Sequence, residues 1–311
     1  MKIYTSLSNY KSTNRTFVTI GTFDGVHIGH QKVIKRLVKD AKKNDATSVL
    51  LTFFPHPRMV LQKDIGIKLI NTIEEKTKLL ASLGLDVLII QEFSQEFSKN
   101  SALDFVRNIL VNTLNVSKLV IGYDHHFGKN REGNFEELKE YSHTYGFKIK
   151  KIKKQEISEI GVSSTKIRLA IENGEIEKAN SYLGYKFPLT GVVELGKNLG
   201  EQIGFPTANL KIEENYKLIP KTGVYIVKSN IDGELVFGMM NIGYRPTVGG
   251  EHQTIETHFF DFKQNLYGKK LKIKVLKQLR NEEKFNSIND LKLQLQKDKI
   301  DSLAFIKTNF L

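Results

Sequence analysis

The chain has 311 residues, a length that suits two domains of ordinary size, and its formal net charge is +13 because 47 Lys and Arg outnumber 34 Asp and Glu. It contains no cysteine, which excludes disulfides, cysteine-ligated zinc, iron–sulfur clusters and thiol catalysis and favours a cytoplasmic location. The longest apolar runs fall far short of the roughly 20 residues that a membrane-spanning helix needs, and the polar start lacks the apolar core of a signal peptide, so we expect no membrane partner.

The first half of the chain alternates short apolar runs with amphipathic segments, which is the pattern of β-α units around a parallel sheet. In chain order we expect a strand at 17–20, a helix at 31–41, a strand at 48–53, a helix at 73–83, a strand at 87–90, a helix at 102–114, a strand at 118–121, a helix at 136–145, an extended segment at 148–152 and two helices within 165–183. Gly84 and Gly146 are the expected stops of two of these helices.

From residue 189 onward the pattern changes to strands punctuated by glycines, which we expect at 190–195, 223–229, 235–241, 254–260 and 270–276. Asp232-Gly233 has the two-residue turn chemistry of a hairpin. The last strand alternates apolar residues with lysines, so one of its faces is buried. Ser287 followed by Asp290 signals the start of a closing helix. A small antiparallel barrel follows a domain boundary near residue 185, which gives domains of 1–184 and 185–311.

One candidate site is the segment 21–30, GTFDGVHIGH, between a predicted strand and a predicted helix. The N–H groups of a helix N-terminus favour a phosphate there, and His27 and His30 can converge on it. For the four-residue motif alone, a glycine-rich turn with incidental histidines is the alternative. The segment 163–168, SSTKIR, opens a helix with hydroxyls and two cations and predicts a second phosphate clamp, unless it is a helix cap with a solvated basic turn.

The predicted barrel carries two further candidates. The stretch 204–209, GFPTAN, follows a glycine-rich loop that lacks the Gly-Lys-Ser/Thr of a Walker A motif. The Thr207 hydroxyl and the Asn209 amide can bind Mg²⁺ and phosphate without adding negative charge, although spacing alone is also typical of an ordinary loop. In the strand at 254–260, alternation puts Glu256 and His258 on one face. A lone glutamate in a strand is usually solvated.

Together these segments resemble the H-x-G-H nucleotidylyltransferases and, in more detail, the bifunctional riboflavin kinase/FMN adenylyltransferase family, also called prokaryotic FAD synthetase. Further matches are TFFPHP at 52–57, Glu75-Lys76, IGYDHHFG at 121–128, REG at 131–133, NIGYRPT at 241–247 and ETHFFDF at 256–262. The resemblance covers essentially the whole chain. It implies an α/β, Rossmann-like nucleotidylyltransferase domain with a parallel sheet, followed by a small antiparallel β-barrel riboflavin kinase domain with a C-terminal helix.

The resemblance also implies the chemistry of the first domain, which is attack of the FMN phosphate on the α-phosphorus of ATP. His27, His30 and Arg168 are its implied catalytic residues, with Thr165 and Arg168 at the β/γ end of the triphosphate. The implied ATP- and phosphate-binding residues are Gly21, Phe23, Asp24, Gly25, His27, His30, Ser164, Thr165 and Arg168. Asp124 is assigned to nucleotide or flavin contact, with a loop-capping aspartate as the alternative.

In the second domain the resemblance implies phosphorylation of riboflavin by ATP. A ribityl hydroxyl must lose its proton, so Glu256 is the implied general base. ATP and Mg²⁺ are expected at Gly204, Pro206, Thr207 and Asn209, with Thr207 and Asn209 as the metal-binding residues. Arg245 either contacts ligand or forms a structural salt bridge.

We therefore expect Mg²⁺ as the cofactor, ATP, riboflavin and FMN as partners, no nucleic acid, and a monomer or weak homo-oligomer. An enzyme with only one working domain is one alternative. A basic nucleic-acid-binding module is another, but only the charge favours it, and scattered lysines usually serve solvation.

Overall fold

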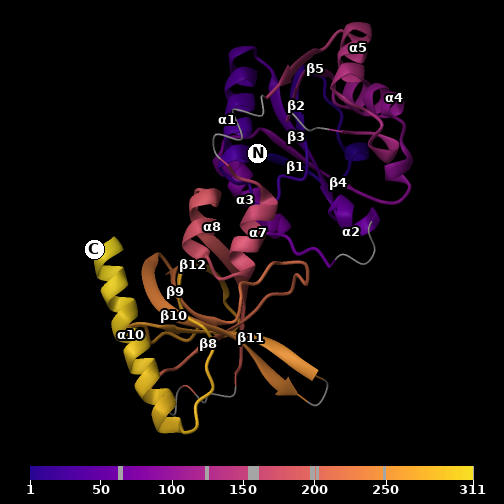
Figure 1. Ribbon diagram of the computed structural model, residues 1–311. Helices are drawn as coiled ribbons and strands as arrows, with labels where there is room; N and C mark the ends of the chain where they lie inside the picture. The colour runs from indigo at the N-terminus through magenta and orange to yellow at the C-terminus, as the bar shows by residue number, and fades with distance from the viewer. Residues whose placement is uncertain are drawn as a thin grey trace. The chain divides into compact units, whose positions relative to one another are not determined.

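The computed structural model describes residues 1–61, 66–122, 126–152, 161–196, 200, 203–247 and 250–310. The chain forms two compact units, which Figure 1 shows as ribbons. The first unit consists of Met1–Leu69 and Ile73–Ser164, and the second consists of Ile70–Thr72 and Thr165–Leu311. The second unit is therefore assembled from two separate stretches of sequence.

A six-stranded parallel sheet forms the centre of the first unit, in the order β1-β4-β3-β2-β5-β6. Its strands are β1 (Lys2–Tyr4), β2 (Thr16–Ile20), β3 (Thr47–Phe54), β4 (Val87–Glu92), β5 (Val116–Ile121) and β6 (Lys148–Lys151). The chain moves outward from β2 through β3 to β4 and then returns to β5 on the other side of β2. The strand order therefore reverses between β2 and β5, and ligands of open α/β sheets bind at the carboxyl ends of strands at such a point.

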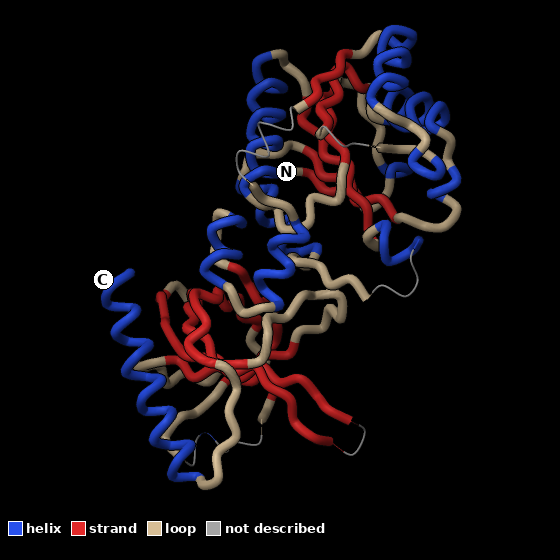
Figure 2. The backbone as a smooth tube through the Cα atoms, viewed as in Figure 1, coloured by secondary structure: helices blue, strands red, loops and turns tan. Residues whose placement is uncertain are grey.

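Helices cover both faces of this sheet (Figure 2). They are α1 (Ile28–Lys43), α2 (Pro57–Leu61), α3 (Ile73–Ser82), α4 (Ala102–Asp104) with the π-helix η3 (Phe105–Thr113), and α5 (Phe135–Tyr145), with short 3₁₀ turns at Leu7–Asn9, Phe97–Lys99 and Lys129–Arg131. Apolar residues of α1 and α3 pack with Leu50 and Leu88 on one face, whereas η3 and α5 pack with Val49 and Ile89 on the other. Adjacent strand residues point to opposite faces, so the buried central strands supply both cores.

The second unit is a closed antiparallel barrel with strand order β10-β11-β8-β7-β12-β9. Its strands are β7 (Phe187–Glu194), β8 (Ala208–Lys211), β9 (Gly223–Ile231), β10 (Glu234–Thr247), β11 (Gly250–Phe259) and β12 (Lys270–Arg280), and its helices are α7 (Ser164–Glu172), α8 (Ile176–Leu183) and α10 (Ile288–Phe310). In the β9–β10 hairpin, Asp232 and Gly233 have φ of 51° and 92°. Ser287 directly precedes α10, and its hydroxyl accepts a hydrogen bond of 3.1 Å from the backbone N–H of Asp290 in the first turn. Both of these local predictions are confirmed.

Residues 70–72 lie buried in the second unit, although they precede α3 of the first. Lys217 donates from Nζ to the carbonyl oxygen of Ile70 at 2.6 Å, and the Tyr185 hydroxyl donates to Oδ1 of Asn71 at 2.9 Å. The Lys217 ammonium also lies 4.4 Å from the centre of the Phe187 ring. This three-residue segment is thus bound into the second unit by hydrogen bonds.

Two segments differ in detail from what the sequence pattern suggests. The helix expected over 102–114 is α-helical only at Ala102–Asp104 and continues as the π-helix η3. At its end the backbone N–H of Leu114 donates to the carbonyl oxygen of Ile109 at 2.9 Å, five positions back, which is the hydrogen bond of a π-helix. For 204–209 an ordinary loop was the alternative by spacing; the segment enters the strand β8 at Ala208, where its backbone pairs with both β7 and β11.

The boundary between the domains was predicted near residue 185, whereas α7 and α8 pack with the second unit. The ranges 1–184 and 185–311 stay a prediction for the two functional domains. Among the described residues, no helix combines the length and the apolar character that crossing a bilayer requires.

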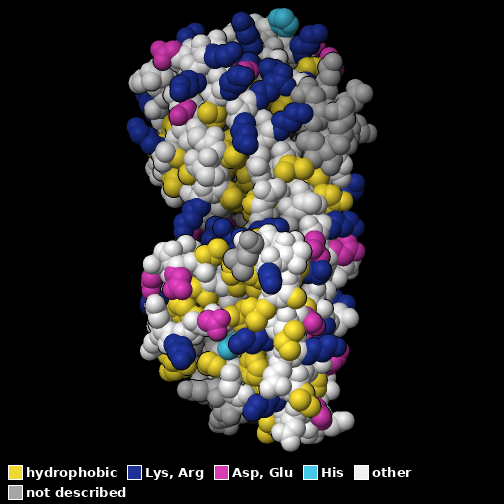
Figure 3. Space-filling view, turned by 90° about the vertical axis from the view of Figure 1, so that its left-hand side faces the viewer, with side chains coloured by type: hydrophobic (Ala, Val, Ile, Leu, Met, Phe, Trp, Pro, Cys, Tyr) yellow, Lys and Arg dark blue, Asp and Glu magenta, His cyan; other side chains and the backbone are white. Residues whose placement is uncertain are grey.

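The excess of positive charge is scattered over the surface. Figure 3 shows Lys and Arg side chains spread over the visible face of the first unit, with fewer Asp and Glu among them. On α1, Lys32, Lys35 and Lys39 are exposed, opposite the apolar face that holds Ile34 and Leu37. Lysines that are scattered over the exposed faces of helices usually serve to keep those faces solvated.

Candidate active sites

The two histidines of the H-x-G-H segment lie at the N-terminus of α1, directly after the loop that follows β2. His27 is the N-cap residue, and its Nδ1 accepts a hydrogen bond from the backbone N–H of His30 at 3.4 Å. The two rings stack with centroids 3.7 Å apart and planes at 19°. Because Nδ1 is the acceptor, a neutral His27 ring carries its proton on Nε2 and can donate it to a ligand.

The loop between β2 and α1 has an unusual backbone. Phe23 and Val26 have φ of 47° and 33°, a left-handed region that costs roughly 1–3 kcal/mol for a residue other than glycine. Gly25, at φ 83°, occupies the same region without that cost. Side chains from three places hold the carbonyl oxygens of this loop: Lys76 Nζ donates to Thr22 at 3.1 Å, Ser164 Oγ donates to Asp24 at 2.9 Å and Gln31 Nε2 donates to Val26 at 2.9 Å.

The two histidines of this first site are largely buried. Burial lowers the pKa of His27 to about 4, and burial together with the nearby charges of His27 and Lys76 holds the pKa of His30 well below its usual range. Both rings are therefore neutral near pH 7. Nδ1 of His30 is buried without a hydrogen-bond partner among the described residues. A phosphate in this position would favour the protonated rings, because an anion stabilises a nearby positive charge.

The remaining predicted residues of the first site fall into three groups. Gly21 and Asp24 lie in the β2–α1 loop, and Ser164 bonds to that loop. Thr165 is exposed and Arg168 is buried on α7, which belongs to the second unit, so their role in adenylyl transfer stays a prediction. The prediction for Asp124 lies outside the described residues.

A cavity of about 310 Å³ opens beside the barrel, between the strands β10 and β11 and the helix α10. Its polar lining includes three residues singled out from the sequence: Thr207, Glu256 and His258. Its apolar lining comes from the barrel and from α10 with the segment before it: Ile203, Phe205, Val224, Met239, Phe285, Leu291 and Leu295. An apolar pocket with a few convergent polar groups is typical of a small-molecule site.

Glu256 and the two predicted Mg²⁺-binding residues come together at one end of the barrel. Oγ1 of Thr207 lies 3.5 Å from Oε2 of Glu256. Asn209 of β8 is directly opposite Glu256 of β11, so the two side chains share a face of the sheet. Gly196 permits this arrangement, because a Cβ there would lie 2.1 Å from Nδ2 of Asn209. Hydroxyl, amide and carboxylate oxygens are ligands that suit Mg²⁺.

His258 fastens the segment that carries Thr207. Its Nδ1 lies 2.9 Å from the carbonyl oxygen of Pro206, which can only accept, so Nδ1 carries the proton. Burial lowers the pKa of His258, while the bond to Pro206 acts in the opposite direction. Gly204 has φ of 85°, where a glycine avoids strain at the start of the turn. Arg245 was predicted to contact ligand or to form a structural salt bridge, and its side chain is not among those that the structure describes.

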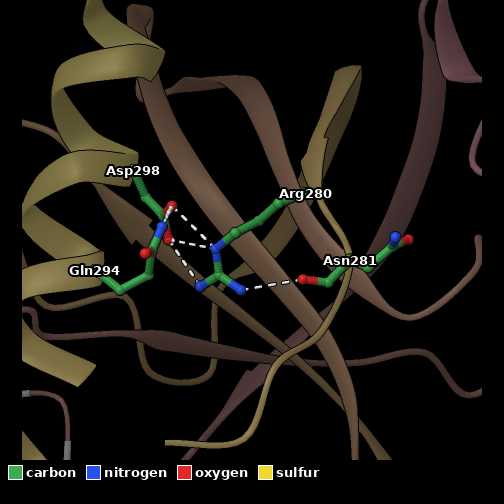
Figure 4. A network of polar contacts seen from close by, with 4 residues as sticks. All are labelled: Arg280, Asn281, Gln294 and Asp298. Atoms are coloured by element: carbon green, nitrogen blue, oxygen red, sulfur yellow. Dashed lines mark hydrogen bonds and ion pairs between the residues drawn. The ribbon is translucent and has the colours of Figure 1, made fainter. Parts of the chain in front are cut away.

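Arg280, which lines the same cavity, joins the barrel to α10 (Figure 4). Its Nε lies 3.0 and 3.1 Å from the two carboxylate oxygens of Asp298, and its Nη2 lies 2.8 Å from Oδ2. Gln294 donates to Oδ1 of Asp298 at 2.9 Å, and Nη1 of Arg280 donates to the carbonyl of Asn281 at 3.0 Å. The pair is buried, since the Asp298 side chain is 2% exposed.

Sequence reasoning missed several residues of both sites. Lys76 was noted only as half of a family dipeptide, and nothing in the sequence shows that its ammonium reaches the β2–α1 loop. Leu291 and Leu295 were correctly placed on a helix, but their place in the cavity depends on how α10 packs. Arg280 and Phe285 carried no signal in the sequence.

Comparisons with known proteins match both halves of the chain. A family model described as FAD synthetase matches residues 9–166, and one described as riboflavin kinase matches residues 183–306. A bifunctional riboflavin kinase/FMN adenylyltransferase of Listeria monocytogenes is 40% identical over 93% of this chain and 91% of its own length. The bifunctional riboflavin kinase/FMN adenylyltransferase of Buchnera aphidicola subsp. Schizaphis graminum is 38% identical over 96% of this chain and 96% of its own length. A crystal structure described as a macrolide-efflux protein of Streptococcus pneumoniae superposes with a TM-score of 0.86 and 28% identity, covering 100% of this chain and 99% of that one.

Proposed function

Because the chain belongs to the family of bifunctional riboflavin kinases/FMN adenylyltransferases, we propose that its two activities reside in the two sites described above. The chain phosphorylates riboflavin with ATP, giving FMN and ADP, and transfers the adenylyl group of a second ATP to FMN, giving FAD and pyrophosphate. The first reaction is assigned to the cavity beside the barrel. The second is assigned to the H-x-G-H site of the parallel sheet.

For the adenylyl transfer, His27 and His30 bind and neutralise phosphate at the N-terminus of α1. The phosphate of FMN is already ionised near neutral pH, so the attack on the α-phosphorus needs no general base. Catalysis then consists of aligning the two phosphates and stabilising the charge that builds up on the leaving pyrophosphate. The Nε2–H of His27 is available for such contacts, as is Nδ1 of His30, which bonds to none of the residues that the structure describes.

For the kinase reaction, Glu256 accepts the proton of the ribityl hydroxyl as that oxygen attacks the γ-phosphorus of ATP. A positioned general base typically contributes about 10²–10⁴-fold to the rate. The single observation that carries this assignment is that Glu256 and Thr207 lie 3.5 Å apart in a cavity that is also lined by apolar residues such as Phe205, Met239 and Leu295. His258 keeps Thr207 in place through Pro206 and takes no proton in this scheme.

Mg²⁺ is the proposed cofactor of both steps, and Thr207 and Asn209 are the residues that would hold it in the kinase site. When bound, Mg²⁺ neutralises the phosphates of ATP. The Thr207 hydroxyl and the Asn209 amide fit this ion because both present oxygens beside Glu256 without carrying charge of their own. We also propose a cytoplasmic location, which the absence of cysteine favours, and a monomer or weak homo-oligomer that does not bind nucleic acid.

A time course tests the proposal. The purified chain is incubated with riboflavin, excess ATP and Mg²⁺, and the flavins are separated by chromatography. We expect FMN to rise first and then to give way to FAD. If FMN accumulates without FAD, also when FMN itself is supplied, the first site has no adenylyltransferase activity; unchanged riboflavin contradicts the kinase assignment.

A further inference from the structure

Lys76 of α3 is a buried lysine at the edge of the H-x-G-H site. Its side chain donates from Nζ to the Thr22 carbonyl at 3.1 Å and to Oγ1 of Thr52 at 3.3 Å, and the residue is 5% exposed. Both acceptors are neutral, and Lys76 forms no ion pair within the described part of the chain. Burial lowers its pKa to about 8, although the charge of Asp24 acts in the opposite direction. Burying a cation without a bonded anion costs free energy. We therefore expect a function of Lys76 that requires its charge.

The contact of Lys76 supports a strained part of the backbone. Phe23 and Val26 both adopt left-handed φ values, and such residues persist only where their surroundings hold them. Within the described residues, four side chains donate to carbonyl oxygens of this loop, and Lys76 is the only one of the four that brings a charge. Thr52 adds a bond from its hydroxyl to the Thr22 carbonyl at 3.2 Å. The Lys76 ammonium therefore lies where it can fix the loop and affect its ligand.

The same ammonium is close enough to His30 to influence its ring. The positive charge of Lys76 helps to lower the pKa of His30, after burial and the charge of His27. The titratable and charged groups around this point are Asp24 on the loop, His27 and His30 on α1, and Lys76 itself on α3. Three of these four are cationic or can become so, which makes the site attractive to a polyphosphate.

We infer that Lys76 is a positioning residue for the adenylyl transfer, whose ammonium holds the β2–α1 loop through Thr22 and supplies positive charge beside His27 and His30 where the triphosphate binds. The inference rests on the proposed location of that reaction. It does not involve the kinase site, so FMN formation in the same chain reports on folding independently of FAD formation.

The test compares Lys76→Met with the full-length wild-type chain. The variant keeps an unbranched apolar side chain, one atom shorter than that of lysine, and removes the ammonium with its charge. We expect kcat/KM for FAD formation from FMN and ATP to fall by about 10²–10³-fold, with most of the loss in kcat, and FMN formation from riboflavin to stay unchanged. NMR titration of the histidine rings supplies a second readout, because removing a nearby positive charge should move the titration of His30 to higher pH.

Two further variants separate charge from packing. Lys78→Met is the matched control, because Lys78 lies on the same helix with an exposed side chain bonded to Glu74 at 2.8 Å, and both activities should survive. Thr52→Val removes one acceptor of Lys76 but keeps its charge. We expect about a tenfold loss of FAD formation from it and no shift of the His30 titration.

The outcomes are distinguishable when His30→Ala is measured in parallel. A wild-type chain that forms no FAD overturns the proposed function and the inference with it. FAD formation that survives in His30→Ala refutes the location of the site. If His30→Ala is inactive while Lys76→Met matches wild type, the inference alone is overturned. If Lys76→Met loses both activities together and Thr52→Val is fully active, Lys76 serves only folding, which also overturns it.

Discussion

Removing the carboxylate of Asp298 should loosen α10 from the barrel. Asp298 accepts three N–O contacts of 2.8–3.1 Å from Arg280 and one bond of 2.9 Å from Gln294, while only 2% of its side chain and 16% of the Arg280 side chain are exposed. Truncating one partner of a buried ion pair leaves the other charge uncompensated and costs about 3–5 kcal/mol. We therefore expect Asp298→Ala to lower the free energy of opening α10 by that amount.

Hydrogen exchange of the full-length chain measures this loss directly. A change of 3–5 kcal/mol corresponds to exchange of the amides of 288–310 that is faster by about 10² to 4 × 10³-fold, since each 1.4 kcal/mol is a factor of ten. The KM for riboflavin should rise as well, because Leu291 and Leu295 of α10 line the cavity. FAD formation from supplied FMN should not change.

Two comparisons make the result decisive. Asp301→Ala, an exposed position on the same helix, should leave the exchange unaltered. Arg280→Met combined with Asp298→Leu should recover much of the protection, because replacing both members of a buried pair by apolar residues is often tolerated. Equal exchange of α10 in Asp298→Ala and wild type would refute the reasoning.

Three further predictions concern the two sites. His30→Ala should abolish FAD formation and leave FMN formation intact; loss of both activities in a folded variant, judged by circular dichroism, argues against separate sites. Glu256→Gln should slow FMN formation by about 10²–10⁴-fold while FAD is still made from supplied FMN, and a near-wild-type kinase rate in stopped-time assays would end its assignment as the base. The pKa of His27, about 4 in the folded chain, is below the ordinary 6.5, so the unfolded chain takes up the proton first and the first unit should lose stability as the pH falls from about 6.5 to about 4. Urea unfolding at several pH values checks this, and a slope that is the same in His27→Gln would contradict it.

Much of the fold was predictable because its local signals agree with its packing. Glycines that end helices, the Asp232-Gly233 turn and the Ser287 cap act over a few residues, and the structure confirms each of them. The alternation of the last strand also holds, since Ile273 and Val275 are fully buried. These features depend on backbone geometry and on burial of one face, both of which a single sequence displays.

The features that sequence reasoning missed depend on partners that are distant in sequence. Strand β8 contains only four residues and exists because Asn209 and Ala208 pair with β11, about 50 positions away. The wide turn of η3 and the burial of Lys76 likewise follow from what packs around them. Residue identity suggested which side chains are chemically useful, whereas the three-dimensional contacts show which of them share a cavity.

The discontinuous second unit constrains how a gene for this chain can be divided. Codons 70–72 lie within the stretch that encodes the first unit, yet their products give Lys217 its carbonyl acceptor and Tyr185 its amide acceptor. A fragment that starts at residue 165 or 185 lacks them, so the buried Lys217 ammonium loses its bond to the Ile70 carbonyl. If the gene is split at a single point between codons 72 and 165, the shortened product therefore keeps these contacts only by binding the other product, which carries residues 70–72.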